Sequence, residues 1–369
     1  MTARDDSLSD RSISTRATGT RTLRRQGIRA ALQRSLPYVL FAGLPAVVVV
    51  TMFVIGLRSG PLALDFHHEL YPEAKEILAG RDPFPAAGTD LTRGENYVWP
   101  PLAALLVSPL TLLPPTVADV AIGLLGLACI GAALWLVGAR DWRVYGVTAL
   151  WPQVIGEIRI SHLTPVLCLL AAIVWRYRDS TVRPGLALGL AGAVKFFLWP
   201  LGLWLIALRN ARAALLAATA AAASLLLVLP FTGLDAFARL LVDLGRAFDQ
   251  DSYSPFGLLV RLGASDALAR SVTLALGVVL LVVMWRRRSF ALAIAASLAL
   301  APIVWFDYYA LAAVPLGVAR PRLSAVWFLP LVTWGLPSSG IATDEVWGVG
   351  RVLVVFAAVL WVSARAERV

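Results

Sequence analysis

Long apolar runs, separated by short clusters of arginine, dominate this sequence and constrain its fold more than any other feature. The runs are rich in Leu, Ala and Val, and several are long enough to cross a bilayer. Inside lipid only helices and closed barrels satisfy every backbone polar group, and these runs lack the alternation of barrel strands. A mean hydropathy of +0.74 agrees with this interpretation. The sequence therefore predicts an all-α, polytopic membrane protein.

The net charge of +10 comes largely from arginines that lie between the apolar runs. In a soluble chain this charge would favour nucleic acid, but the distribution is typical of cytoplasmic loops, so we expect the lipid bilayer as partner and no nucleic acid. With both termini cytoplasmic, the number of crossings is even, and we expect about 12 transmembrane helices, within a range of about 10 to 13. The clusters expected on that side are Arg140 to Arg143, Arg176 to Arg183, Arg209 to Arg212, Arg286 to Arg288, Arg320 to Arg322 and Arg365 to Arg368.

Two domains of very different character are expected. Residues 1–35 are rich in arginine, serine and threonine, which predicts a disordered cytoplasmic tail. Residues 36–369 form a single transmembrane domain, whose first span is predicted from Leu36 to Leu57. The two cysteines, Cys129 and Cys168, lie inside apolar runs, so neither a disulfide framework nor a thiolate metal site is supported.

Prolines interrupt several apolar runs, at Pro152, Pro165, Pro200 and Pro302, which predicts short or broken helices around a protein-lined cavity. The stretch 100–115 is bracketed by Pro-Pro pairs and carries no basic cluster after it, so we interpret it as re-entrant or interfacial. Polar outer-face loops are then expected at about 58–99 and 231–255, with a smaller one from Pro337 to Glu345. Because the first loop is acidic, unlike the cytoplasmic loops, we expect the chemistry there.

Asp65 stands where the first span leaves the membrane, and His67, His68 and Glu69 follow it. A carboxylate at that depth is costly unless it has a partner or a use. Two interpretations stay open: a reactive carboxylate, or the N-cap of a helix from about Phe66 to Ala79. Adjacent histidines on a helix point about 100° apart, which favours hydrogen bonding to a phosphate or sugar over metal ligation.

Lys195 lies deep in an apolar stretch and is one of only two lysines in the chain. A buried ammonium group needs an anionic ligand or a carboxylate partner, unless the side chain snorkels to the interface. Other polar residues near the proline breaks are candidates for lining one cavity, with an ion pair between Glu157 and Arg159 as the structural alternative. The cavity candidates are Glu69, Trp99, Glu157, Arg159, His162, Asp307 and Tyr308.

Several motifs together resemble the signature of glycosyltransferase family 87. They are Asp65, Tyr71 with Ala74, the stretch GRDPF at 80–84 and the stretch YVWPPL at 97–102. The segment GLAGAVK that ends at Lys195 and the late segment APIVWFDYYAL are similar to two further family motifs. The chain departs from the family in two places: it has Ser161-His162-Leu163-Thr164 in place of a Gly-Gln-x-Asn turn, and Asp307 where a histidine is common.

This resemblance implies the GT-C fold of the family's polyprenyl-phosphate-mannose-dependent mannosyltransferases of actinobacteria. It implies inverting transfer of a hexose, mannose in the family, from a polyprenyl-phosphate donor to a glycolipid or glycan acceptor. Asp65 would be the general base in such an enzyme. The residues expected to bind the donor phosphate or sugar are Lys195, His67, His68, Arg81 and Tyr71.

The transfer is expected to be metal-independent and to need no cofactor, with a divalent cation left open. The resemblance places the enzyme in the plasma membrane with its active site on the extracytoplasmic side. A multi-pass transporter or flippase for a lipid-linked sugar is the alternative function. Such a protein should show matching helix interruptions in two related halves, and the sequence shows no such repeat.

Overall fold

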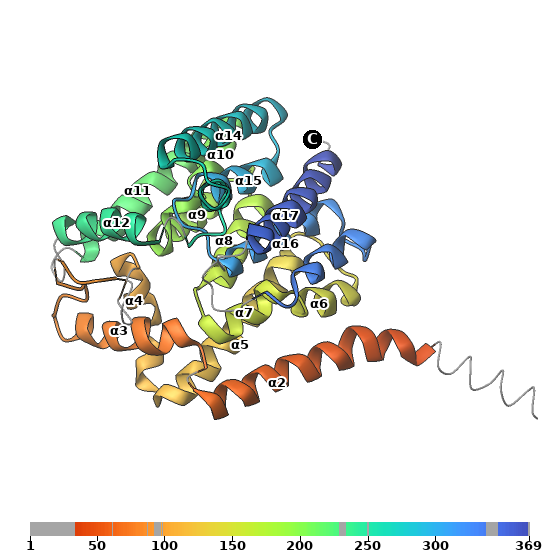
Figure 1. Ribbon diagram of the computed structural model, residues 1–369, viewed down its shortest axis with the longest axis horizontal. Coiled ribbons are helices and arrows are strands. Elements are labelled where there is room, and N and C mark those ends of the chain that lie inside the picture. Colours follow the sequence, from red (N-terminus) through yellow and green to blue (C-terminus); the bar gives the residue numbers. More distant parts are fainter. Residues whose placement is uncertain are drawn as a thin grey trace, which may run out of the picture.

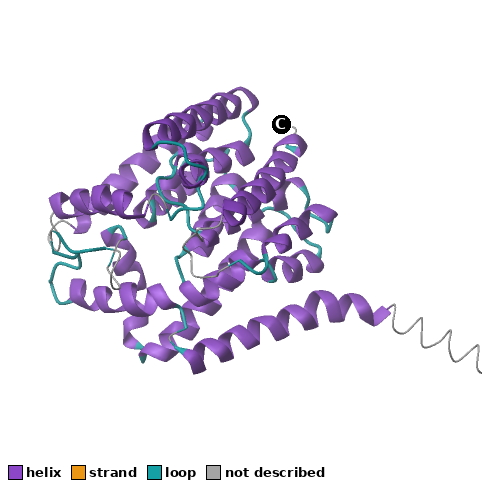
Figure 2. Ribbon diagram, in the orientation of Figure 1, coloured by secondary structure: helices purple, strands orange, loops and turns teal. Residues whose placement is uncertain are grey.

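The structure is a computed structural model that describes residues 34–60, 62–86, 88–91, 97, 99–228, 234–248, 251–336 and 346–367. Helices fill most of these ranges, which contain no strand, and this confirms the all-α fold class (Figure 2). The label η marks short 3₁₀ or π-helical segments. The elements up to residue 176 are η1 (Val39–Gly43), α2 (Leu44–Ser59), η2 (Phe66–Leu70), α3 (Tyr71–Leu78), α4 (Pro101–Val107), η3 (Ser108–Leu112), α5 (Pro115–Leu136), α6 (Trp142–Ala149), α7 (Pro152–Ile160) and α8 (Thr164–Arg176). The elements that follow are α9 (Val182–Val194), η4 (Phe196–Leu198), α10 (Pro200–Ala207), α11 (Ala211–Val228), α12 (Leu234–Phe248), α13 (Pro255–Arg261), α14 (Asp266–Arg287), α15 (Phe290–Leu300), η5 (Phe306–Ala312), α16 (Ala313–Ala319), η6 (Ala325–Thr333) and α17 (Val346–Ala366).

Within the described ranges, four helices are long and apolar enough to cross a membrane: Arg34–Ser59, α5, α14 and α17. The first of them contains the span predicted from Leu36 to Leu57 and lies along one edge of the molecule (Figure 1). Shorter apolar helices make up most of the rest of the bundle. These helices identify a membrane protein, and the count of about 12 crossings stays a prediction.

The predicted helix breaks coincide with helix boundaries. Helix α7 begins at Pro152, α10 begins at Pro200, and Pro165 lies in the first turn of α8. Helix α15 ends at Leu300, two residues before Pro302. Proline lacks a backbone N–H, so it is tolerated in the first turn of a helix and not in its interior.

Small residues allow α9 and α11 to pack closely side by side. Added Cβ atoms at Gly185 and Gly189 would lie 2.9 Å from the Ala213 carbonyl oxygen and 2.6 Å from the Ala220 Cβ atom, respectively. Because lipid supplies no hydrophobic drive between helices, close contact of this kind is a principal source of their association. The pairing fixes where α9 ends, and therefore where Lys195 is placed.

Hydrogen bonds join the basic loops at shared ends of the bundle. The Asn210 amide, after α10, donates to the Arg178 carbonyl, after α8, at 2.7 Å. The Trp204 indole donates to the carbonyl of Arg288, at the end of α14, at 2.8 Å. A similar link joins the other two internal clusters, because Asp141 accepts from the backbone N–H of Leu323 at 3.0 Å. These links join neighbouring clusters within two groups, and the placement of all clusters on one side stays a prediction.

The two predicted outer loops contain helices and meet each other. The first contains η2 and α3, and the second contains the amphipathic helix α12. Phe237 of α12 stacks on Phe84, with ring centroids 5.6 Å apart. The segment from Pro101 to Leu112 has a length of about 20 Å, shorter than the hydrocarbon core, which agrees with a re-entrant or interfacial element. Residues 1–33 of the tail and the loop from Pro337 to Glu345 lie outside the described residues.

Candidate active site

Asp65 lies at the start of η2, two residues after a turn in which Ala63 has a left-handed φ of +58°. Its side chain makes no capping hydrogen bond, and its own backbone is already helical. The interpretation of Asp65 as an N-cap is therefore wrong, although the predicted helix from about Phe66 to Ala79 is observed as η2 and α3. The Asp65 carboxylate instead contacts Nε2 of His162.

His162 lies in the short turn between α7 and α8. Its neighbours Ser161 and Leu163 have left-handed φ values of +61° and +59°, which cost free energy for residues other than glycine and are frequent at functional sites. The imidazole is buried, and its Nδ1 lies 2.8 Å from Oδ1 of Asp307. Each ring nitrogen of His162 therefore faces a carboxylate.

Asp307 lies in the first turn of η5 and is only 1% exposed. Its second oxygen, Oδ2, accepts a hydrogen bond from the Thr164 hydroxyl at 2.7 Å. The Thr164 N–H donates in turn to Oε1 of Glu157 at 3.0 Å. Buried carboxylates persist only with such partners. Asp65, His162 and Asp307, hereafter the Asp–His–Asp chain, thus connect three distant segments of the sequence.

Lys195 lies between α9 and η4, and its extended backbone breaks the helix at this point. Its ammonium group contacts the Tyr308 hydroxyl and lies 3.8 Å from the centre of the Trp99 ring and 4.2 Å from that of Tyr308. Phe197 stacks on Tyr308 with centroids 5.1 Å apart. The ammonium is thus held by aromatic faces through cation–π attraction inside the bundle, rather than by snorkelling to the interface.

Trp99 connects Lys195 to the helix that carries Asp65. Its indole N–H donates to Oε2 of Glu69 at 3.0 Å. Its ring centroid lies 5.9 Å from that of His162. Burial and the nearby charge of Asp65 raise the pKa of Glu69 to about 8. Trp99 therefore contacts both the Asp–His–Asp chain and the lysine.

Other predicted donor-binding residues have different partners. The His67 Nδ1 atom lies 2.7 Å from Oδ2 of Asp119, and the His67 and His68 rings are 4.8 Å apart. The Tyr71 hydroxyl donates to the Leu113 carbonyl at 2.9 Å. Arg81 is exposed and forms an ion pair with Glu76. Their roles in donor binding stay predictions.

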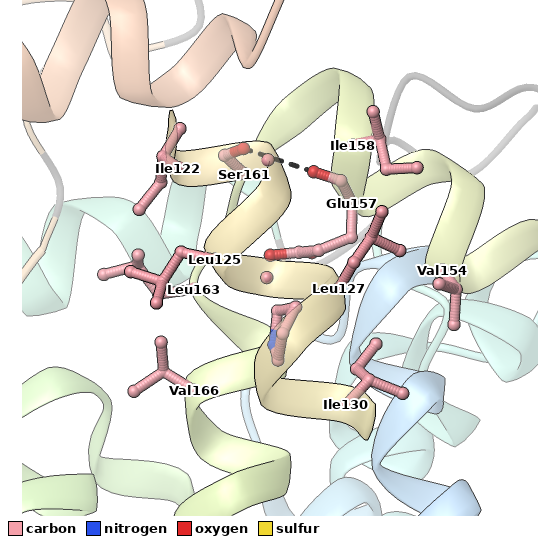
Figure 3. Close-up of a pocket in the computed structure, with 13 residues that line it drawn as sticks. Ile122, Leu125, Leu127, Ile130, Val154, Glu157, Ile158, Ser161, Leu163 and Val166 are labelled. Atoms are coloured by element: carbon pink, nitrogen blue, oxygen red, sulfur yellow. Dashed lines mark hydrogen bonds between the residues drawn. The ribbon is translucent and has the colours of Figure 1, made fainter. Parts of the chain in front are cut away.

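Glu157 is buried and Arg159 is exposed, so the two residues lie on different faces of α7. Figure 3 shows the Glu157 side chain in the wall of a mostly apolar pocket between α5, α7 and α8. The pocket is also lined by Ser161 and Leu163, the neighbours of His162. Oε2 of Glu157 is buried without a hydrogen-bond partner.

One group of side chains in the described part of the chain has the composition of a metal site. Ligand atoms of Glu157, His162 and Asp307 lie within 4.8 Å of one another. His and carboxylate ligands suit Zn²⁺ or Mn²⁺. Both nitrogens of His162 already face carboxylates, however, so a cation would have to replace one of these contacts.

Two residues of this arrangement are absent from the candidates predicted from sequence. Thr164 supports Asp307, and Asp119 pairs with His67. Asp119 had a visible signal, since it is the one acid within the apolar run that forms α5. Thr164 had none, because a threonine that begins a helix is ordinary.

Comparison with known proteins places this arrangement in a family. The family model for glycosyltransferase family 87 matches residues 97–315, which is more than half of the chain. The matched range contains Trp99, His162, Lys195 and Asp307, whereas Asp65 precedes it. No curated protein and no solved structure gives a significant match. The resemblance inferred from the sequence motifs is confirmed, and the chain belongs to glycosyltransferase family 87.

Proposed function

We propose that this glycosyltransferase moves a hexose, mannose by family analogy, from a polyprenyl-phosphate donor to a glycolipid or glycan acceptor, with inversion at the anomeric carbon. The observation that supports this proposal best is the Asp–His–Asp chain. It offers a base, Asp65, that is held in place by a histidine, next to a confined cation. A transfer of this kind needs one base for the acceptor and one positive group for the phosphate.

Asp65 serves as the general base in this proposal. As the acceptor oxygen attacks the anomeric carbon, the acceptor O–H bond breaks and Asp65 takes the proton, while the bond from the sugar to the phosphate oxygen breaks. The proton stays on Asp65, whose carboxylate is positioned by its contact with Nε2 of His162. Asp307 orients the same imidazole through Nδ1.

Lys195 binds the donor phosphate. The phosphodiester gains a second negative charge as it becomes polyprenyl phosphate, and an ammonium group in a low-dielectric site stabilises that charge strongly. Because Trp99 and Tyr308 neutralise none of the lysine charge, the ammonium keeps its attraction for an anion. The leaving phosphate needs no proton. Asp65 is therefore the one residue that has to accept a proton during the reaction. We propose that no metal takes part.

The orientation follows from the helices that connect the site to the basic loops. Helix α8 begins at Thr164, in the site, and ends at Arg176; helix α9 begins beside Arg183 and ends just before Lys195. If the basic loops are cytoplasmic, as the positive-inside rule indicates, the site lies towards the other side. We therefore propose an extracytoplasmic active site in the plasma membrane, with both termini cytoplasmic.

The test uses the purified chain in liposomes with polyprenyl-phosphate [³H]mannose and candidate glycolipids. We expect a new glycosidic bond of inverted anomeric configuration, unaffected by EDTA. Lys195→Ala should lose donor binding, whereas Lys75→Ala, at an exposed position, provides the matched control. Movement of the intact donor across the membrane without a new bond would instead establish the transporter alternative. Retention of anomeric configuration would contradict the single-base mechanism.

A further inference from the structure

Glu69 is a second carboxyl group on the same helical face as Asp65. The two residues are four positions apart, which places their side chains on one face of the helix that begins at η2. The Glu69 side chain is half-buried. Its Oε2 atom accepts a hydrogen bond from the Trp99 indole.

Trp99 places Glu69 next to the proposed phosphate site. The indole donates its N–H to Oε2 of Glu69, and the face of the same indole carries the Lys195 ammonium group. One rigid ring thus positions a carboxyl group at its edge and a cation on its face. A phosphate bound by Lys195 would therefore lie close to Oε1 of Glu69.

The charge state of Glu69 decides whether this neighbour attracts or repels a phosphate. Its pKa is raised to about 8 by burial first and by the charge of Asp65 second, and its bond to Trp99 and the charges of His162 and Lys195 oppose the shift. At neutral pH the carboxyl group therefore holds its proton. A neutral carboxyl group donates a hydrogen bond, whereas a carboxylate would repel an anion in a low-dielectric site.

We propose that Glu69, in its protonated form, donates a hydrogen bond to the donor phosphate beside Lys195, and so sets an alkaline limit to donor binding. This inference rests on the proposed function in one respect, since it takes a polyprenyl phosphodiester as the ligand. Two donors then hold the phosphate: the Lys195 ammonium and the Glu69 hydroxyl. Asp65 accepts the proton of the acceptor.

The test measures binding rather than transfer. The probe is a polyprenyl methyl phosphate, a phosphodiester that carries one negative charge throughout pH 6.5–9.5 and no sugar. With a pKa of about 8, Glu69 is about nine-tenths protonated at pH 7 and about one-tenth at pH 9. We expect wild-type affinity, measured in nanodiscs, to fall about tenfold between these pH values.

Glu69→Gln keeps a hydrogen-bond donor at every pH, so its affinity should fall about tenfold less than that of the wild type over the same range. Glu73→Gln is the matched control, since Glu73 lies one turn further along the same helix, and it should reproduce the wild-type profile. An alkaline fall that persists unchanged in Glu69→Gln would overturn the proposal, because the titrating group would then be another one, such as Lys195. Equal affinity of the wild type at pH 7 and pH 9 would overturn it as well.

The same experiment separates this inference from the proposed function. Wild-type protein that binds the probe with the expected profile but transfers no sugar would refute the transfer reaction and leave the role of Glu69 intact. Sugar transfer by a wild type whose probe binding is the same as that of Glu69→Gln at every pH would refute the role of Glu69 alone. Failure of the wild type to bind the probe would refute both.

Discussion

Replacement of Asp307 by asparagine tests the Asp–His–Asp chain from its inner end, away from both substrates. Asp307→Asn keeps the size of the side chain and leaves an oxygen that can accept from Nδ1 of His162. It removes the negative charge that faces the imidazole at 2.8 Å. The substitution should therefore affect the proton transfer far more than the binding of the donor.

The magnitude follows from Coulomb's law. Charge centres about 4 Å apart, at an effective dielectric constant of about 20, attract by about 4 kcal/mol. The loss of this attraction releases His162 from its position beside Asp65, and it slows the reaction by about 10³-fold when the whole interaction acts in the transition state. Thr164→Val removes only the hydrogen bond from the Thr164 hydroxyl to the Asp307 carboxylate, worth about 1.5 kcal/mol, and should slow the reaction by about tenfold.

The assay is steady-state transfer of [³H]mannose in liposomes, with the thermal unfolding of each variant recorded to confirm folding. We expect kcat of Asp307→Asn to fall about 10³-fold while KM for the donor changes little. A folded Asp307→Asn variant with kcat within tenfold of the wild type would refute the positioning of Asp65 by Asp307 through His162. Equal losses in Asp307→Asn and Thr164→Val would indicate that Asp307 acts only as a structural support.

Two further predictions concern stability. Gly189→Ala should lower the free energy of unfolding by about 1–3 kcal/mol, because its Cβ atom would meet the Cβ atom of Ala220 at 2.6 Å. Gly131→Ala is the control, since its Cβ atom would have nothing within 4 Å and the free energy of unfolding should not fall. Thermal melts in detergent compare the two variants. Burial, with the charges of Glu76 and Asp82, raises the pKa of Glu73 from 4.5 to about 7. Below pH 4.5 both the folded and the unfolded states hold this proton, and above pH 7 its loss favours the unfolded state, so Glu73→Gln should raise the melting temperature at pH 8 and not at pH 4. A Glu73→Gln effect of equal size at both pH values would contradict the assignment.

The sequence was sufficient to predict the fold class because the physics of the bilayer acts locally. Apolar runs must be helical in lipid, and a proline often begins or interrupts a helix. Pro152 and Pro200 therefore marked helix starts that the structure contains. The helix at 234–248 was missed because its charged residues, spaced around an amphipathic helix, look like a polar loop in a linear scan.

The site could be predicted only in part, because its contacts join distant segments. Asp65 and Lys195 were visible as costly charges next to or inside apolar runs. The contact of Asp65 with His162 was not visible, since it depends on how η2 packs against the turn after α7. The cap interpretation of Asp65 failed for the same reason: a local rule assigned the carboxylate a backbone partner, whereas tertiary packing supplied a histidine.

The two departures from the family signature are in contact with each other. His162 lies in the turn where the family has Gly-Gln-x-Asn, and Asp307 stands where a histidine is common, yet their side chains lie 2.8 Å apart. The two residues therefore form part of the Asp–His–Asp chain of this protein.

The most direct measurement of the central claim compares Asp65→Asn with the wild type in the presence of bound donor. Asparagine cannot accept the acceptor proton, so we expect sugar transfer to fall by at least about 10²-fold. Donor affinity should stay within about threefold of the wild type, because Lys195 is unchanged. Undiminished transfer by a folded Asp65→Asn variant would show that another group is the base, and would contradict the catalytic role of the Asp–His–Asp chain.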